Sequence, residues 1–160
     1  DHAMGIVTSA EEIHTKGLSF TKHAKKEIET LCRAVKDICD LTTESFCMDK
    51  VEEAMHVEPL EEVIDTLAKK IKENHIKRLK KGKCTIEMGF ILEDILTGLE
   101  RVSDHCSNIA VEMITIYDND YSTHEYFENF STEERASFDK EYEELMKRYP
   151  IGKQEAATTG

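Results

Sequence analysis

Tryptophan is absent from this 160-residue sequence, and only two prolines occur, Pro59 and Pro150. Sparse proline, together with abundant Lys, Glu, Leu and Ile, favours long helices over strands and turns. No apolar run approaches the roughly 18 to 20 residues of a membrane span, and no signal peptide is visible. No strand pattern competes with the helical one, and the length predicts a single domain.

Positive charge is also scarce. The chain has 21 Lys and Arg residues against 33 Asp and Glu, which gives a formal net charge of −12. Such a charge repels a nucleic-acid backbone and suits the binding of cations, so we expect no nucleic-acid partner. The sequence has no Gly-rich phosphate loop, no G-x-S-x-G motif and no Ser/His/Asp arrangement, which argues against an enzyme.

The five cysteines follow no disulfide pattern. Their number is odd and no C-x-x-C occurs, so neither a disulfide framework nor a zinc knuckle is expected. Cys32, Cys39 and Cys106 fall in helical apolar stripes, where a free cysteine behaves as a small hydrophobic residue. Free thiols indicate a reducing compartment, and we expect a cytoplasmic location.

The two ends of the chain are expected to lie outside the main fold. Residues 1–5 resemble an expression-vector remnant, and residues 6–17 look like the end of a preceding helix. Ser9 to Glu12 have the spacing of a capping box, which predicts a short helix from there to Gly17. We expect residues 151–160 to form a disordered tail.

Apolar residues at steps of three and four predict a first long helix over residues 18–48. Its apolar face consists of Ala24, Ile28, Leu31, Val35, Ile38, Thr42 and Phe46.

A second helix is predicted from Asp49, which can cap it, to Lys81. Pro59 lies inside this span, so the helix either kinks there or starts afresh at Glu58 with the proline in its first turn. The basic residues before Gly82 suit the negative end of a helix dipole, and the glycine suits a left-handed cap. The basic run from Lys77 to Lys83 therefore reads first as a helix end, with contact to anionic lipid or a partner as the alternative.

A third helix is predicted from Thr85 to Tyr117, where an Asp118-Asn119-Asp120 sequence ends it. Its apolar stripe contains Ile91, Leu92, Ile95, Leu99, Val102, Cys106, Ile109, Met113 and Tyr117. A second capping box, Ser131 to Glu134, opens a shorter helix on which Phe138, Tyr142, Leu145 and Tyr149 line up. The sequence therefore predicts an all-α fold, an antiparallel three-helix bundle (18–117) with a C-terminal helical extension (118–150) that packs across it.

Carboxylates gather on two of these helices. Glu58, Glu61 and Asp65 share one side of the second helix. On the third helix Glu93, Glu100, Asp104 and Asn108 share a side away from the apolar stripe, and Ser103 and Ser107 beside them would let a neighbouring helix approach closely. Two facing stripes of this kind suit hard or borderline cations. With so many acidic residues, solvated faces that bind nothing are the alternative.

Two further patterns are weaker. Glu53-x-x-His56 matches half of a di-iron carboxylate motif, but such sites need a second copy, and none is present. A di-metal enzyme is therefore the least favoured function. His105 points about 100° away from Asp104 on a helix and has the pattern of a packed or surface histidine rather than a ligand.

The segment from Leu99 to Ala110, LERVSDHCSNIA, resembles the signature of the PhoU family of phosphate-uptake regulators. The resemblance extends over about residues 18–114. Residues 73–90, with Gly82, Cys84 and Gly89, are similar to the PhoU-like tails of bacterial sodium/phosphate cotransporter-type membrane proteins. This implies the second repeat of such a tail, and a parent protein in the inner or plasma membrane.

The resemblance implies a function and a set of ligands. PhoU proteins carry clustered metal ions on E/D-x-x-x-D motifs, which correspond here to Glu61 with Asp65 and Glu100 with Asp104. Glu58, Glu93 and Asn108 are possible additional ligands, and the ions could be iron, zinc, manganese or magnesium. The function implied is regulation of a sodium-dependent phosphate transporter through its membrane portion or other cytoplasmic regulators. A metal-free helical scaffold or adaptor is the alternative. Because a PhoU protein usually holds two repeats, we also expect a homodimer.

Overall fold

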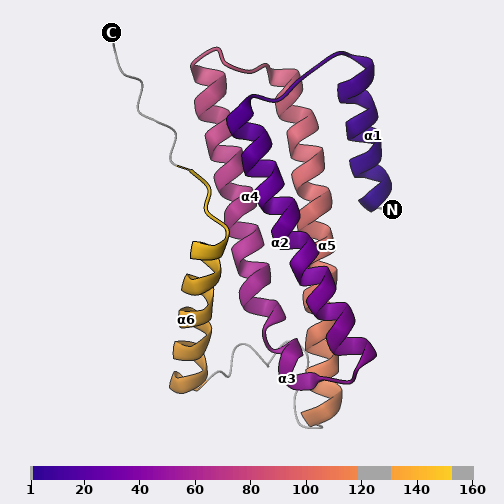
Figure 1. Ribbon diagram of the computed structural model, residues 1–160, viewed down its shortest axis with the longest axis vertical. Helices are drawn as coiled ribbons and strands as arrows, with labels where there is room; N and C mark the ends of the chain where they lie inside the picture. The colour runs from indigo at the N-terminus through magenta and orange to yellow at the C-terminus, as the bar shows by residue number, and fades with distance from the viewer. Residues whose placement is uncertain (1, 119–130, 153–160) are drawn as a thin grey trace.

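The computed structural model describes residues 2–118 and 131–152, which form helices and their connections and contain no strand. The bundle has three long helices, α2 (Lys22–Cys47), α4 (Val57–Lys80) and α5 (Ile86–Asp118), of which α4 runs antiparallel to both α2 and α5 (Figure 1). Two further helices flank them: α1 (His2–Thr15) packs on α5, and α6 (Thr132–Arg148) packs on α4. This confirms the predicted all-α bundle with an additional C-terminal helix.

The core lies between α2, α4 and α5, where the predicted apolar faces meet. Its fully buried side chains include Leu31, Ile38, Ile64, Leu67, Ile71, Leu92 and Leu96. Burial of aliphatic side chains from three helices is the main stabilising contribution to such a bundle. Three residues of the predicted stripes are nevertheless exposed, since Phe46, Ile109 and Tyr117 keep 65%, 43% and 73% of their surface accessible.

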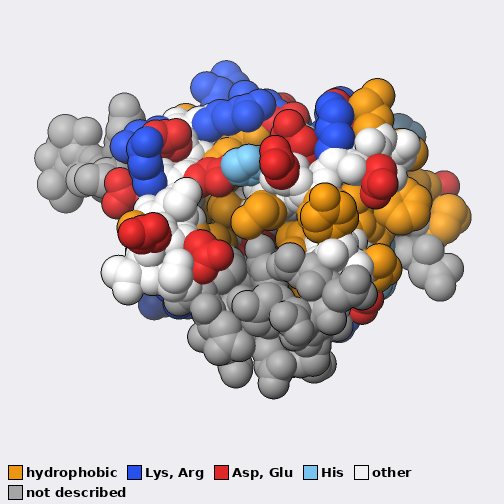
Figure 2. Space-filling view, turned by 90° about the horizontal axis from the view of Figure 1, so that it is seen from below, with side chains coloured by type: hydrophobic (Ala, Val, Ile, Leu, Met, Phe, Trp, Pro, Cys, Tyr) orange, Lys and Arg blue, Asp and Glu red, His pale blue; other side chains and the backbone are white. Residues whose placement is uncertain are grey.

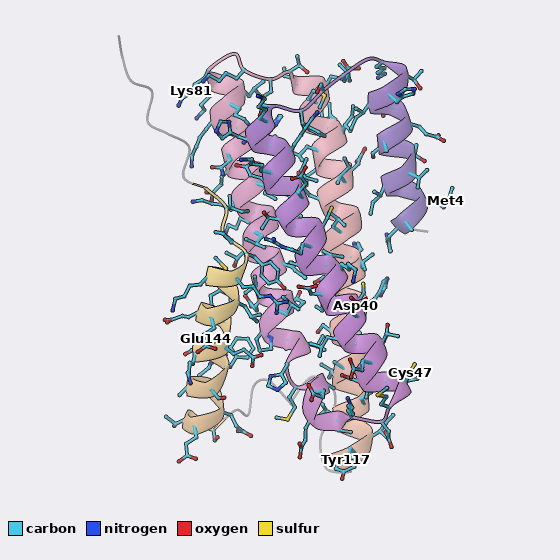
Figure 3. All side chains as sticks on the ribbon, viewed as in Figure 1. Met4, Asp40, Cys47, Lys81, Tyr117 and Glu144 are labelled. Carbon is cyan, nitrogen blue, oxygen red and sulfur yellow. The ribbon has the colours of Figure 1, made fainter. Side chains whose placement is uncertain are left out.

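These exposed residues lie toward the end of the bundle at which α3 (Val51–Ala54) sits. Figure 3 labels Tyr117 there, next to the end of α2 at Cys47. Figure 2 views this end and shows hydrophobic side chains exposed among acidic ones. Within the described ranges, no helix has both the length and the apolar character that a membrane span requires.

The first helix begins earlier than the sequence predicted. α1 starts at His2, so Ser9 is a buried residue in mid-helix and not a cap. Its end is as predicted: Gly17 has a φ of 61°, and the Leu18 N–H donates to the Ile13 carbonyl, as in a Schellman cap. Gly98 on α5 allows α1 to approach closely, because a Cβ there would lie 3.1 Å from Ile6 Cγ1.

The predicted start of the second helix was partly wrong. Asp49 does not cap it but has a φ of 53°, and the Lys50 N–H donates to the Ser45 carbonyl, so these residues end α2. After the short α3, the helix starts afresh at Val57 with Pro59 in its first turn, where a missing N–H costs nothing. Its end carries the predicted glycine cap, with Gly82 at a φ of 65°.

The C-terminal helix α6 starts at the predicted capping box, in which Ser131 and Glu134 bond reciprocally. It lies alongside α4 in Figure 1 rather than across the bundle. Tyr149 anchors its end: the side chain is fully buried, and its hydroxyl donates to Asp37 on α2 at 2.5 Å. The predicted disordered tail over residues 151–160 begins too early, because Ile151 is partly buried and packs against the core. Residues 153–160 and the predicted break at residues 119–120 fall outside the described residues.

The five cysteines are free thiols, as expected. Cys106 is buried and Cys39 half-buried, and their sulfur atoms lie 3.9 Å apart across the α2–α5 interface. Burial raises the pKa of the Cys39 thiol to about 11, and the neighbouring Cys106 adds to this shift. Cys39 is therefore a neutral packing residue at neutral pH.

Candidate metal centre

The carboxylates of α4 and α5 meet along the line where these two antiparallel helices pack. On α4, the core residues Leu60, Val63 and Ile64 face inward, which turns the neighbouring acidic side of the helix toward α5. On α5, Ser103 is fully buried, and its small side chain lets the helices approach closely. The sequence therefore places oxygen ligands on both sides of one seam.

Three of the predicted ligands form a cluster. Glu61 and Asp65 from α4 and Asp104 from α5 each offer a carboxylate oxygen, and these atoms all lie within 4.8 Å of one another. Glu61 and Asp104 are half-buried and Asp65 is exposed. We call these three residues the carboxylate cluster.

The cluster brings groups of like charge close together. Burial, together with the charges of Asp65, Glu58, Glu62 and Asp104, raises the pKa of Glu61 to about 8. Burial also raises the pKa of Asp65, as do Glu100 and Asp104. Across the described residues, no hydrogen bond or ion pair joins a cation to Glu61, Asp65 or Asp104.

Glu100, the fourth predicted ligand, lies beside the cluster but is held by a lysine. Lys72 on α4 contacts Glu100 at 3.0 Å and Glu93 at 3.1 Å. These ion pairs raise the pKa of Lys72 against the opposing effect of burial. The structure thus separates the seam into a lysine-neutralised part, with Glu93 and Glu100, and the carboxylate cluster.

The other two possible ligands flank the opposite side of the cluster. The Ser107 hydroxyl donates to Glu58 at 2.5 Å, while burial raises the pKa of Glu58 despite this hydrogen bond. Asn108 is exposed on the next turn of α5. The sequence predicts Ser107 only as a small residue at the helix contact, and the structure shows that it also donates a hydrogen bond to a carboxylate.

The donor set fits a divalent cation. Three carboxylates from two helices provide an all-oxygen site, and their mutual repulsion is relieved when a cation binds and they ionise together. Glu61, Asp65 and Asp104 would hold such an ion, and Glu58 and Glu100 lie next to them on the same seam. Hard or borderline ions such as magnesium, manganese or iron suit oxygen donors better than zinc does.

The weaker sequence candidates do not join this cluster. His56 contacts Glu141 of α6 at 2.9 Å, and Glu53 is exposed on α3, so neither contributes to the seam. His105 is exposed, and its ring packs at 5.4 Å from that of His2. Sequence reasoning missed Lys72, whose position seven residues after Asp65 was the signal that could have placed it on the same side of α4.

The part of the chain that matches a known protein family includes this seam. Residues 28–113, more than half of the chain, match the PhoU domain, and this range contains every residue of the seam. The chain belongs to the PhoU domain family.

One curated relative gives a fuller comparison. The phosphate-specific transport system accessory protein PhoU homolog 1 of Thermotoga maritima is 28% identical over 91 residues. The aligned region covers 57% of this chain and 39% of the relative, so the chain spans well under half of that protein. No solved structure matches the chain.

Proposed function

We propose that this PhoU domain regulates phosphate transport and binds a divalent cation at Glu61, Asp65 and Asp104. Its family and the phosphate-transport name of the Thermotoga relative support the regulatory part. The observation that carries the metal part is the convergence of three carboxylates within 4.8 Å, none of which forms an ion pair with a described lysine, arginine or histidine.

The chemistry of the seam suggests how binding could be transmitted. The cluster joins α4 to α5, so neutralising it removes repulsion between two helices of the bundle. A bound cation would supply positive charge and link the two helices. The three carboxylates would turn toward it and be deprotonated. The proposed role is regulatory and not enzymatic, which the PhoU family and the accessory-protein name of the Thermotoga relative support.

The setting proposed for this domain is a sodium-dependent phosphate transporter, with the domain on the cytoplasmic side. It would contact the membrane portion or another cytoplasmic regulator. The similarity of residues 73–90 to cotransporter tails supports this setting. Phosphate uptake in cells that lack the domain, measured with and without sodium, tests it; unchanged uptake and unchanged regulation would refute the transporter role.

The metal site is tested by metal content per chain, measured by plasma mass spectrometry on protein purified without a metal-affinity column. We expect stoichiometric manganese, iron or magnesium in the wild type and its loss in Asp104→Asn. Asp94→Asn is the matched control, because Asp94 is an exposed aspartate on the same helix. Absence of metal from the wild type, even after incubation with each ion, would favour the metal-free scaffold.

We also propose that the chain forms a homodimer. Ile109, Ile116 and Tyr117 on α5 and Phe46 on α2 are large apolar side chains that stay exposed. Association would remove them from water. Sedimentation that shows only monomer at high concentration would contradict this proposal.

A further inference from the structure

A second site lies at the end of the bundle opposite α3. The α1–α2 and α4–α5 connections meet there, as the ribbon in Figure 1 and the label of Lys81 in Figure 3 show. Between them is a cavity of about 270 Å³, lined in part by Ser19, Thr21, Arg78, Lys83 and Thr85. Such a volume holds several water molecules and is large enough for a small ion of a few heavy atoms.

The lining of the cavity carries basic side chains although the protein as a whole has a net charge of −12, and one of them, Arg78, is ion-paired with the buried Glu27. Arg78 and Lys83 line the cavity, and none of its described lining residues is acidic. Lys77, Lys80 and Lys81 occupy the adjoining end of α4. A basic opening of this kind concentrates anions against the field of an acidic protein.

Arg78 is buried, with 3% of its surface accessible, yet its hydrogen bonding is incomplete. One terminal nitrogen donates to Glu27 at 2.7 Å, and Glu27 also accepts from Asn74 at 2.8 Å. The Nε and the second terminal nitrogen are buried without a hydrogen-bond partner in the described structure. Buried guanidinium donors are nearly always satisfied, so these two indicate a missing acceptor.

Two helix N-termini also border the cavity. Thr21 caps α2, its hydroxyl oxygen accepting from the Ala24 N–H, and Thr85 does the same for the Met88 N–H at the start of α5. The first turns of helices carry unpaired N–H groups and the positive end of the dipole. Anions bind at such positions, and a tetrahedral oxyanion also fits the forked donors of an arginine.

We propose that this cavity binds a small tetrahedral oxyanion between Arg78, Lys83 and the starts of α2 and α5. The assignment of this oxyanion as inorganic phosphate rests on the proposed function. The anion accepts hydrogen bonds from the unpartnered guanidinium nitrogens, which requires a small shift of the side chains that cover them. The site shares no residue with the carboxylate cluster. The two proposals can therefore be tested separately.

The first experiment is titration of the full chain with inorganic phosphate, followed by calorimetry and by amide chemical shifts. We expect saturable binding, with the largest shifts at Ser19, Thr21, Lys83 and Thr85. Absence of saturation at millimolar phosphate, or shifts centred elsewhere, would overturn the proposal. Sulfate is titrated for comparison. If it binds with the same affinity as phosphate, the cavity is an oxyanion site, but the assignment of phosphate as its specific ligand is refuted.

Variants locate the site without disturbing the buried ion pair. Lys83→Gln, at an exposed position, should weaken phosphate binding by at least about tenfold, because a charged hydrogen bond is lost. Lys81→Gln is the matched control: it removes the same charge from an exposed lysine nearby that does not line the cavity. Ser19→Glu places a carboxylate at the cavity and should abolish binding. Equal effects of the two lysine variants would refute the assigned location.

Lipid phosphate is separated from free phosphate by sedimentation with vesicles of phosphatidylcholine containing phosphatidic acid. We expect no cosedimentation at physiological salt, since the net charge of the chain opposes an anionic surface. Vesicle binding that depends on Lys83, without saturable binding of free phosphate, would overturn the proposal in favour of a lipid headgroup.

Discussion

Replacing Glu61 by glutamine should stabilise the metal-free protein. Glu61 has a pKa of about 8 in the folded chain because it is half-buried among other carboxylates. Its ordinary pKa is 4.5, so the folded state keeps a proton that the unfolded state loses between these two pH values. Stability due to this group is therefore unaffected below pH 4.5 and decreases as the pH rises toward about 8.

The size of this effect follows from the shift. At about 1.4 kcal/mol per pKa unit, an unscreened group would cost about 5 kcal/mol above pH 8. Because Glu61 remains partly exposed, solvent screening reduces this cost, and we expect about 2 kcal/mol. For a chain of this length that corresponds to an increase of about 6 °C in the melting temperature of Glu61→Gln at pH 8.5.

The assay is thermal unfolding, followed by circular dichroism, from pH 4 to pH 9 in the presence of a chelator. The difference between Glu61→Gln and wild type should be near zero at pH 4 and increase up to pH 8.5. Glu143→Gln, at an exposed position on α6, is the control and should show no such pH dependence. A constant difference at every pH, or a less stable glutamine variant at pH 8.5, would refute the argument from repulsion.

Metal addition extends the same experiment. A cation that binds the cluster stabilises the folded state by about 2.7 kcal/mol at a hundredfold excess over its Kd. Millimolar manganese should therefore raise the melting temperature of the wild type well above that of the chelated protein, and raise that of Glu61→Gln much less. Binding must also release the proton of Glu61, so affinity should decrease as the pH falls below about 8.

Three other substitutions test particular contacts. Lys72→Gln frees Glu100 from its ion pair, so calorimetry should show severalfold tighter manganese binding. The free energy of unfolding of the metal-free variant should be lower by about 1 kcal/mol, and an unchanged manganese affinity would contradict this account. Tyr149→Phe removes the hydrogen bond to Asp37 and should cost about 1 to 2 kcal/mol in chemical denaturation, with faster proteolysis of α6; a stability equal to wild type would show that the bond is not needed. Gly98→Ala places a Cβ 3.1 Å from a side chain of α1 and should cost about 1 kcal/mol, with faster amide exchange in α1 alone; uniform exchange would argue against it.

Much of the fold could be predicted because it depends on local periodicity. The three long apolar stripes placed α2, α5 and the end of α4 to within a few residues, and the capping box at Ser131 placed the start of α6. Pro59 left two alternatives, a kink or a new start, which periodicity cannot separate because both keep the same apolar face. The choice depends on how the chain turns at α3, and the positive φ of Asp49 sets that turn.

Other features depend on tertiary contacts that no local pattern encodes. The early start of α1 is stabilised by packing on α5 at Gly98. This contact, between residues far apart in the sequence, extends the helix beyond the start that the capping-box spacing at Ser9 predicts. The docking of α6 depends on a hydrogen bond between Tyr149 and Asp37, which are 112 residues apart. A periodic stripe predicts that a helix has a buried side but not which helix covers it.

The candidate site shows the same division within a single set of residues. Helical spacing put Glu61, Asp65, Glu100 and Asp104 on two acidic stripes, but spacing treats them as equivalent. The register of α4 against α5 along the helix axes makes them different. Lys72 forms an ion pair with Glu100, whereas none of the other three carboxylates has an ion pair with a described side chain, and Lys72 only offsets part of the pKa increase of Asp65. A solvated acidic face would spread its charges apart or pair each with a lysine. Three half-buried or exposed carboxylates held together are neutralised in part by the proton that Glu61 retains, and a bound cation would replace that proton. This convergence is the physical argument for the proposed metal site, and helical spacing alone did not contain it.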